Sequence, residues 1–377
     1  MKILFIPTIY PSKKNSVKGI FIKEHAKAAS LYNEIVVLYN ENCEKNMKRM
    51  WKIISDEKED GIRTIRIKTK KSLIPKTTYI LYVWSIISTF RKLLKENWRP
   101  DIIHVHIFSA GIPAIILGKI YKIPIVITEH WSGFPRKILK NFNLLKARFI
   151  MNKANAILPV SKYLEQNIKN YGIKNYFQII PNVIDNKIFF PLNKKVNNEN
   201  KKRILFVGLL THVKGISYLF KALFELKKKR QDFILDVVGD GENKNEYENL
   251  AKKLKLQKII KFHGLKTKRE VVNFMKNCDF FVQPSLYETF GITFIEAMAC
   301  GKPIVTTNIP VLKEKINKER GILVPPKDIN ALKKAIDYML DHYQNYSAEK
   351  ISQYTKNNFS YKIIGRKINN VYKKLTE

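Results

Sequence analysis

Short apolar runs alternate with helical patterns along most of the chain, and this alternation limits the possible folds more than any other feature. In the first half, the strand-like runs 101–106 (DIIHVH) and 123–128 (IPIVIT) are separated by a segment with helical spacing, 110–121. The alternation resumes in the second half, with strand-like runs at 203–207 and 233–238. Repeated strand–helix units form parallel sheets with helices on both faces. We therefore expect an α/β fold built from doubly wound, Rossmann-like sheets.

A polar stretch interrupts this alternation near the middle of the chain and predicts a boundary between two domains. Residues 193–202 (NKKVNNENKK) contain almost no apolar side chain, as is typical of a linker. A chain of 377 residues is long enough for two domains of roughly 150 residues each. We expect one domain over 1–190, a second over 191–357, and a helix within 358–377 that packs back on the first. Doubly wound sheets bind ligands at the carboxyl ends of their strands, so we expect a central cleft that both domains face.

The chain is strongly basic, with 69 Lys and Arg against 32 Asp and Glu, a formal charge of +37. No acidic residue occurs between Asp60 and Glu96, or between Glu129 and Glu165. One explanation is a composition rich in lysine, asparagine and isoleucine together. The others are a surface for anionic lipid or a phosphorylated acceptor, and nucleic-acid binding. The last is disfavoured because neither zinc-finger spacing nor an RNP-type aromatic motif accompanies the charge.

Cysteine spacing and apolar run lengths predict where the protein resides. Cys43, Cys278 and Cys300 lie far apart, so we expect neither a disulfide framework nor a CxxC metal site. The N-terminal apolar run stops at Pro7, too early for a secretory signal. The longest nearly apolar stretch, 79–90, is shorter than the ~20 residues that span a bilayer. We expect a cytoplasmic protein, or one peripheral on the inner face of the cytoplasmic membrane.

The segment 288–303 is the most informative motif. It contains Glu288 and Glu296, with Gly291 between them at the start of a predicted short helix. The glycine lets a ligand approach the backbone closely, and the free N–H groups of the next turn form an anion site. One carboxylate can then lie beside what the helix end binds, and the other can bind a more distant part of the ligand.

Glu288-x₇-Glu296, followed by Gly301-x-Pro303, resembles the signature of the family-four retaining glycosyltransferases, which have the GT-B fold of two Rossmann-like domains. Further segments resemble this family in the expected order: 101–106, 180–185, 207–215 and 238–241. The resemblance implies an acceptor-side first domain and a second domain that binds a nucleotide-sugar.

The resemblance also implies a role for individual residues. Glu288, against the donor sugar, and His106, at the reaction centre, would be the catalytic residues. Glu296 would hydrogen-bond the ribose hydroxyls of the donor, and Lys214 would pair with its diphosphate. The other donor-binding residues would be Gly19, Gly208, Phe290, Gly291 and Ile292.

Several of these positions have a second interpretation. His106 ends an apolar strand and could be a buried structural histidine, while His130 and, less favourably, His104 could face the acceptor. The family often has an arginine after the glycine aligned with Gly208, where this chain has Leu209. One cation of a phosphate clamp is then missing, and His212, Lys18 or bound water could replace it.

The sequence contains no Asp-x-Asp, HExxH or Cys/His cluster, so we expect no metal and no cofactor apart from the substrate itself. By resemblance, the function is retaining, metal-independent transfer of a hexosyl group from a nucleotide diphosphate-sugar. The acceptor would be a saccharide or a lipid-linked saccharide, in cell-surface polysaccharide, lipopolysaccharide or glycolipid synthesis. The alternatives are a nucleotide-sugar epimerase or a phosphorylase of the same architecture and, less favoured, a non-enzymatic basic nucleic-acid-binding protein.

Residues 136–153 mix basic and apolar side chains over a predicted helix. They could lie on an anionic membrane surface. A core-packed helix with a solvated basic face explains the pattern equally well.

Overall fold

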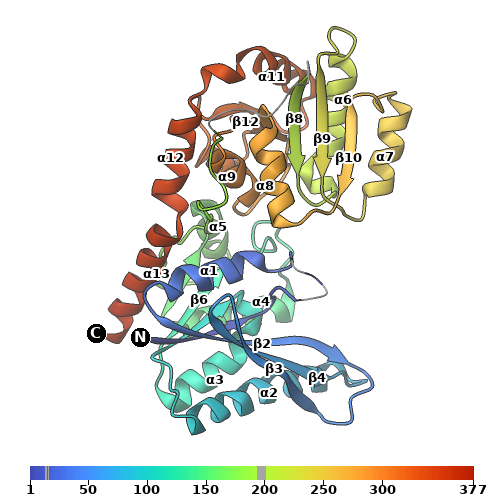
Figure 1. The fold of residues 1–377 in the computed structure, drawn as a ribbon. Coiled ribbons are helices and arrows are strands. Elements are labelled where there is room, and N and C mark those ends of the chain that lie inside the picture. Colours follow the sequence, from blue (N-terminus) through green and yellow to red (C-terminus); the bar gives the residue numbers. More distant parts are fainter. Residues whose placement is uncertain (13–14, 16, 193–200) are drawn as a thin grey trace. The chain divides into compact units, whose positions relative to one another are not determined.

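The computed structural model describes residues 1–12, 15, 17–192 and 201–377 (Figure 1). It divides into two compact units: unit 1 contains residues 1–183 and 361–377, and unit 2 contains residues 184–360. Each unit has its own parallel β-sheet and helices, so the prediction of two doubly wound α/β domains is confirmed. The unit boundaries fall seven residues before and three residues after the expected ones. Most of the predicted linker lies outside the described residues.

Unit 1 is built on a seven-stranded sheet in the order β3-β4-β2-β1-β5-β6-β7. All of its strand pairs are parallel except β3 with β4. The strands are β1 (Lys2–Pro7), β2 (Glu34–Glu44), β3 (Trp51–Glu59), β4 (Ile62–Lys70), β5 (Ile102–His106), β6 (Ile125–Glu129) and β7 (Ala156–Pro159). The helices are α1 (Ile20–Ser30), α2 (Pro75–Lys95), η1 (Phe108–Ala110), α3 (Gly111–Tyr121), α4 (Asn141–Lys153), α5 (Lys162–Lys169) and α13 (Tyr361–Thr376).

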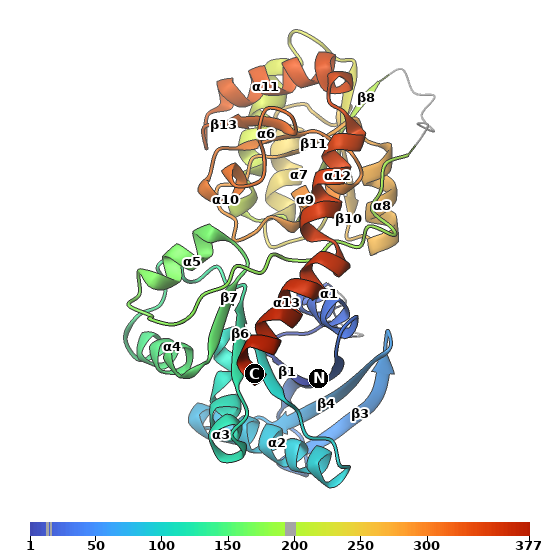
Figure 2. The same ribbon diagram turned by 90° about the vertical axis from the view of Figure 1, so that its left-hand side faces the viewer.

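The C-terminal helix α13 belongs to unit 1 and runs beside α1 (Figure 2). A Cβ atom at Gly365 would lie 2.2 Å from the carbonyl oxygen of Ala28, so the glycine permits close approach of the two helices. Side chains also join them, because the Tyr361 hydroxyl donates a hydrogen bond to Glu24. The last helix of the chain thus completes the core of the first unit.

Unit 2 has a six-stranded sheet in the order β10-β9-β8-β11-β12-β13, and every described pairing in it is parallel. The strands are β8 (Lys202–Val207), β9 (Phe233–Val238), β10 (Ile260–Gly264), β11 (Phe280–Gln283), β12 (Ile304–Thr307) and β13 (Gly321–Val324). The helices are η2 (His212–Lys214), α6 (Ile216–Leu226), α7 (Lys244–Lys253), α8 (Lys268–Asn277), α9 (Ile292–Ala299), α10 (Pro310–Lys313), α11 (Ile329–His342), η3 (Tyr343–Asn345) and α12 (Ala348–Phe359).

The strand order reverses at β8, which has β9 on one side and β11 on the other. Loops that leave a parallel sheet on opposite sides of such a switch point separate and create room for a ligand. In unit 1 the same reversal occurs at β1, between β2 and β5. These two positions indicate where a site should be sought in each unit.

One predicted helix is shorter than expected, because α4 begins at Asn141 and not near residue 136. Lys137 has a φ angle of 55°, in the left-handed region, and this residue interrupts a right-handed helix. Residues 132–137 form turns, and residues 138–140 lead from them into α4 without regular secondary structure.

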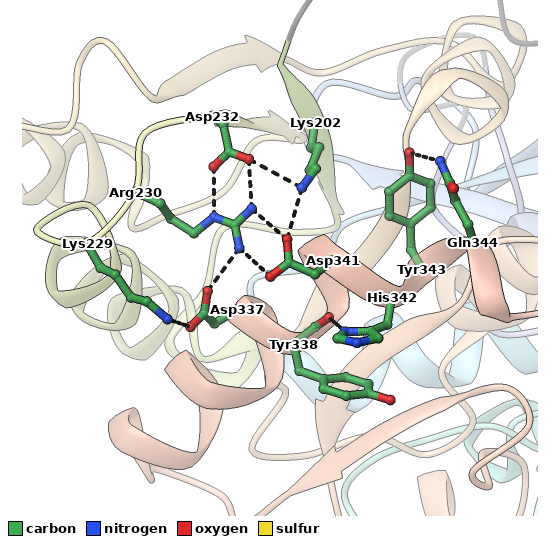
Figure 3. Close-up of polar contacts among 10 residues, drawn as sticks. All are labelled: Lys202, Lys229, Arg230, Asp232, Asp337, Tyr338, Asp341, His342, Tyr343 and Gln344. Carbon is green, nitrogen blue, oxygen red and sulfur yellow. Dashed lines mark hydrogen bonds and ion pairs between the residues drawn. The ribbon is translucent and has the colours of Figure 1, made fainter.

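Arg230 holds one edge of unit 2 together by binding three carboxylates at once (Figure 3). Its guanidinium donates to Asp232 just before β9 and to Asp337 and Asp341 on α11, at 2.7–3.1 Å. Lys202, at the start of β8, adds a bond of 3.1 Å to Asp341. Hydrogen bonds from Arg230 lower the pKa of Asp341 to about 2. The network ties α11 to the end of the sheet where β8 and β9 begin, opposite the loops of the switch point.

Among the residues that the structure describes, no helix has both the length and the apolar character needed to cross a bilayer.

Candidate active site

The loops that follow β8, β9 and β11 pack closely in unit 2, and glycines allow this. A Cβ atom at Gly215, whose φ angle is 70°, would lie 2.0 Å from the carbonyl oxygen of Pro284. A Cβ atom at Gly239 would lie 1.9 Å from the carbonyl oxygen of Gly208. Any side chain at Gly215 or Gly239 would therefore force the loops apart. The predicted glycine motifs shape the site at the switch point of this sheet.

Glu288 and Lys214 meet in this group of loops although they lie 74 residues apart in sequence. The Lys214 Nζ atom lies 2.6 Å from Glu288 Oε1, and the Ser285 hydroxyl donates to the same oxygen at 3.0 Å. The backbone N–H of Leu286 donates to the Val213 carbonyl at 2.8 Å and fastens the two loops. Glu288 is buried and held by both contacts. Two residues that the sequence predicted separately thus form one ion pair.

Helix α9 begins directly after Gly291, whose φ angle of 78° is left-handed. The helix is eight residues long, and its first turn is anchored by Thr293, which donates to Gln283 Oε1 at 3.0 Å. Glu296 is half-buried on the same helix. The Phe290 ring is buried, so only the backbone of this predicted donor-binding residue is available for a ligand.

Lys315 is a second cation near Glu288, and the sequence analysis missed it. Its side chain is buried, donates to the Val311 carbonyl at 2.9 Å and lies 4.7 Å from the centre of the Phe290 ring. Burial lowers the pKa of Lys315 to about 8, although the nearby carboxylates of Glu314 and Glu288 oppose this shift. The surrounding sequence KEKINKE is typical of a solvated surface, so no signal pointed to a buried lysine.

Leu209 occupies the position where the family often has an arginine, and its side chain is 59% exposed. His212, one candidate to replace that cation, contacts the Asn243 amide at 2.9 Å and lies 3.5 Å from Glu246. Its ring is therefore engaged with the start of α7. Lys214 remains the cation that the structure brings next to Glu288.

Unit 1 gathers three buried histidines from three elements: His106 from the end of β5, His130 after β6 and His25 from α1. His106 Nδ1 lies 3.3 Å from His130 Nε2. The His25 ring centre lies 5.3 Å from that of His130 and 5.8 Å from that of His106. Sequence reasoning singled out His106 and His130 but missed His25. A signal existed, because Glu24 and His25 interrupt the apolar, alanine-rich face of their helix.

The predicted glycine loop leads into the helix that carries His25. Gly19 has a φ angle of 76°, immediately before α1. A Cβ atom on it would lie 2.8 Å from the carbonyl oxygen of Ile9, so this loop also packs too tightly for a side chain.

Burial keeps the histidines neutral. It lowers the pKa of His25 to about 4, and it lowers the pKa values of His104, His106 and His130 well below the usual range. Beside them, Glu129 accepts hydrogen bonds from three backbone N–H groups at 2.8–3.0 Å. Burial nevertheless raises the pKa of Glu129 to about 7. At neutral pH these imidazoles can form hydrogen bonds but carry no charge.

His104 has a different role from the acceptor contact that the sequence suggested. Its Nδ1 atom lies 2.5 Å from the Tyr372 hydroxyl, and its Nε2 atom lies 2.7 Å from the Thr128 hydroxyl. Both ring nitrogens are thus engaged inside unit 1, which leaves neither for an acceptor. The ring stacks on that of His106 at a centroid distance of 4.3 Å, so His104 supports its neighbour.

The backbone directly after His106 is strained. Ile107 has a φ angle of 69°, which a β-branched side chain rarely adopts. Its N–H donates to the Thr128 carbonyl at 2.9 Å, which holds the chain in this conformation. Such strain costs about 1–3 kcal/mol and collects at functional sites, which favours a functional His106.

The three histidines could also hold a metal ion, because one nitrogen from each lies within 4.8 Å of the others. Histidines that bind metals almost always donate their second ring nitrogen to a carboxylate or carbonyl. Such contacts are present in part, because His25 interacts with the backbone of Pro181, and both His25 and His130 interact with the Asn182 side chain. His106 Nε2 has no hydrogen-bond partner among the described residues. Metal independence stays a prediction.

Two family models match the chain along most of its length. The model "Glycosyltransferase Family 4" matches residues 53–187, and "Glycosyl transferases group 1" matches residues 188–358. The border between the two matches lies close to the border between the two units.

Proteins of related sequence are named as a glycogen synthase and as a glycosyltransferase. The chain is 28% identical over 256 residues to a glycogen synthase of Mycobacterium tuberculosis, a match that covers 65% of this chain and 61% of that protein. The chain thus spans less than two thirds of the length of this relative. It is 30% identical over 268 residues to an uncharacterized glycosyltransferase of Haemophilus influenzae, covering 70% of this chain and 73% of the relative.

A solved structure has the same fold. The Anabaena protein HepE, in complex with UDP and glucose, matches with a TM-score of 0.77 at 18% identity over 99% of both chains. At this identity the likeness shows the architecture alone, which is the GT-B fold.

Proposed function

The chain belongs to the glycosyltransferases of group 1 and family 4, and from this premise we propose that it is a retaining, metal-independent hexosyltransferase. The donor is a nucleotide diphosphate-sugar, and the acceptor is a hydroxyl of a saccharide or lipid-linked saccharide. The observation that carries the proposal is the Lys214–Glu288 ion pair beside Gly291, at the switch point of the unit 2 sheet.

The site in unit 2 supports binding of such a donor. Lys214 and the free N–H groups at the start of α9 are suited to the two phosphates. Glu288 accepts hydrogen bonds from sugar hydroxyls once Lys214 moves to the diphosphate, and Glu296 accepts from the ribose. The complex of HepE with UDP and glucose makes a uridine diphosphate-sugar the first donor to test.

The proposed step forms a bond between an acceptor oxygen and the anomeric carbon and breaks the bond from that carbon to the diphosphate oxygen. The electron pair leaves with the diphosphate, which also takes the proton of the acceptor hydroxyl. Attack from the face that the diphosphate leaves gives retention. Lys214 and the α9 amides stabilise the developing charge, and removal of one such donor typically costs ~3–4 kcal/mol.

In unit 1, the proposal gives His106 and His130 roles as neutral hydrogen-bonding groups, His106 for the donor sugar and His130 for the acceptor. A saccharide is one acceptor to test, because one relative is named as a glycogen synthase. The proposal places the protein in the cytoplasm, at or near the inner face of the membrane.

Two substitutions test this assignment. Thermal shifts with a panel of nucleotide-sugars identify the donor, and a transfer assay then measures the product. Glu288→Ala should abolish transfer and leave nucleotide binding mostly intact, whereas Glu296→Ala should mainly weaken nucleotide binding. Glu319→Ala is the matched control, because that side chain is 71% exposed.

The product separates the competing functions. A glycoside with the donor's anomeric configuration supports the proposal. A free sugar epimer or a sugar phosphate would assign an epimerase or a phosphorylase of the same architecture. Full transfer activity in both glutamate variants would overturn the site assignment.

A further inference from the structure

The outward face of α4 carries large apolar side chains. Phe142 is 75% exposed, Leu145 is 62% exposed and Phe149 is 51% exposed. They occur at positions i, i+3 and i+7 and so share one side of the helix. The opposite side is buried in unit 1, through Ala147, Ile150 and Met151. The helix thus has a core face, and its exposed face is apolar rather than only basic.

Basic residues flank this apolar face. Arg136, Lys137 and Lys140 are exposed immediately before the helix, and Lys153 is exposed at its end. Ile138, in the same approach segment, is also exposed. We call these residues the α4 surface: Arg136, Lys137, Ile138, Lys140, Phe142, Leu145, Phe149 and Lys153. Because no acidic residue occurs between Glu129 and Glu165, its charge is of one sign.

The start of α2, which contacts α4, also combines exposed apolar side chains with a lysine contact. The Lys146 ammonium group on α4 lies 3.8 Å from the centre of the Tyr79 ring on α2. Close to Tyr79 in the chain, Leu73 is fully exposed and Ile74 and Ile80 are more than half exposed. Neighbouring elements of unit 1 therefore combine exposed apolar side chains with lysines.

We propose that the α4 surface docks the protein on an anionic lipid bilayer. Phenylalanine and leucine side chains on an exposed helix face can enter the boundary between headgroups and acyl chains. The flanking cations then lie at the level of the anionic headgroups. Nucleic acid fits this surface less well, since aliphatic side chains gain little from a phosphate backbone. The proposal deepens the proposed function, on which its acceptor claim rests, because a membrane-docked transferase favours a lipid-linked acceptor.

Vesicle cosedimentation of the full chain tests the docking without any donor or acceptor. We expect binding to vesicles of phosphatidylcholine mixed with phosphatidylglycerol, and much weaker binding to phosphatidylcholine alone. The double variant Phe142→Ser with Phe149→Ser should lower the partition coefficient at least about tenfold. Lys137→Glu with Lys140→Glu should remove most of the preference for the anionic mixture.

Matched variants control for a general loss of apolar surface or charge. Leu31→Ser with Ile120→Ser removes two side chains of unit 1 that are 56% and 58% exposed. Lys252→Glu with Lys253→Glu changes two exposed lysines on α7. Both control proteins should bind vesicles like the wild type. Circular dichroism checks that every variant is folded.

Three results would overturn the proposal: equal binding to both vesicle types, unchanged binding of the Phe142 and Phe149 variant, or equal losses in the control variants. A change of oligomeric state in the Phe142 and Phe149 variant would assign the surface to a contact between copies. Binding to RNA in place of vesicles would assign it to nucleic acid. Transfer to a water-soluble acceptor is measured separately, so failed docking leaves the proposed glycosyltransferase function standing.

Discussion

The two units hold their functional candidates in opposite electrostatic states. Unit 1 buries His25, His106 and His130 as neutral rings. Unit 2 places a lysine and a glutamate in direct contact, with Lys214 Nζ 2.6 Å from Glu288 Oε1. Full burial without an opposite charge favours the neutral form of an imidazole, whereas a close partner favours the charged forms.

Under the proposed function, this difference would divide the chemistry between the units. The loops of unit 2 would supply the cation and N–H donors for the diphosphate, and Glu288 would bind sugar hydroxyls. The imidazoles of unit 1 would add uncharged hydrogen-bonding groups for sugar and acceptor hydroxyls. Each half of the comparison can be tested separately.

Loss of Lys214 should have the largest effect. In Lys214→Ala, the buried Glu288 side chain loses its cation, and the developing charge on the leaving diphosphate loses a partner. We expect transfer efficiency, measured as kcat/KM, to fall about 100- to 1000-fold, which corresponds to ~3–4 kcal/mol. Lys214→Arg should recover part of the activity because it restores the charge. A wild-type value of kcat/KM in Lys214→Ala would mean that the charged pair of unit 2 does not serve the reaction.

Acid should destabilise unit 1 more than unit 2. The pKa of His25 is about 4 in the folded chain and about 6.5 when unfolded, so stability is lost as pH falls from 6.5 to 4. This one group should cost about 2 kcal/mol between pH 7 and pH 5. Glu129, whose pKa is raised to about 7, has the opposite effect and offsets the stability lost through one histidine. The other buried histidines still leave a net loss of stability in acid.

Tryptophan fluorescence can measure this loss in unit 1 alone. All four tryptophans lie within residues 1–183, at positions 51, 84, 98 and 131. Urea unfolding at pH 7 and pH 5, followed by this signal, should show the expected drop. His25→Leu should flatten the pH dependence by about 2 kcal/mol. If His25→Leu lost as much free energy of unfolding between pH 7 and pH 5 as the wild type, the His25 ring would take up its proton equally well in the folded and the unfolded chain.

The sequence could predict the architecture but only part of the site. The strand–helix alternation is local, and it predicted a parallel sheet with helices in each unit. It missed β3, since WKIISDEKE carries many charges, and it missed β13, which has four residues. Lys214 and Glu288 were each predicted, but their contact depends on the pairing of β8 with β11, which no local pattern contains. His25 and Lys315 were missed because burial, which gives them their altered pKa values, is a property of the folded chain.

The Arg230 network should have a smaller effect, on stability alone. Arg230→Met leaves Asp232, Asp337 and Asp341 close together without their shared cation. Because the carboxylates are partly exposed, we expect a loss of only about 1–2 kcal/mol in the free energy of unfolding of unit 2. Far-UV circular dichroism during urea unfolding measures it. Lys229→Met, at a side chain that is 73% exposed, is the control and should change little. A large fall in kcat/KM for Arg230→Met would mean that charge far from the loops also serves the reaction.

Lys315 should give the smallest effect and the sharpest test, because it is buried although its ammonium group lies 3.9 Å from Glu314 Oε2. Its pKa is about 8 in the folded chain and about 10.5 when unfolded, so the unfolded chain binds more protons between these values. Stability of unit 2 should therefore rise as pH increases from 8 toward 10.5, by about 1 kcal/mol between pH 8 and pH 9. Lys315→Met removes this titration, so the free energy of unfolding of the wild type should rise relative to that of the variant by that amount over the same step. A constant difference, measured by circular dichroism at both pH values, would mean that Lys315 stays charged, and that the carboxylates of Glu314 and Glu288 and the Phe290 ring together outweigh burial.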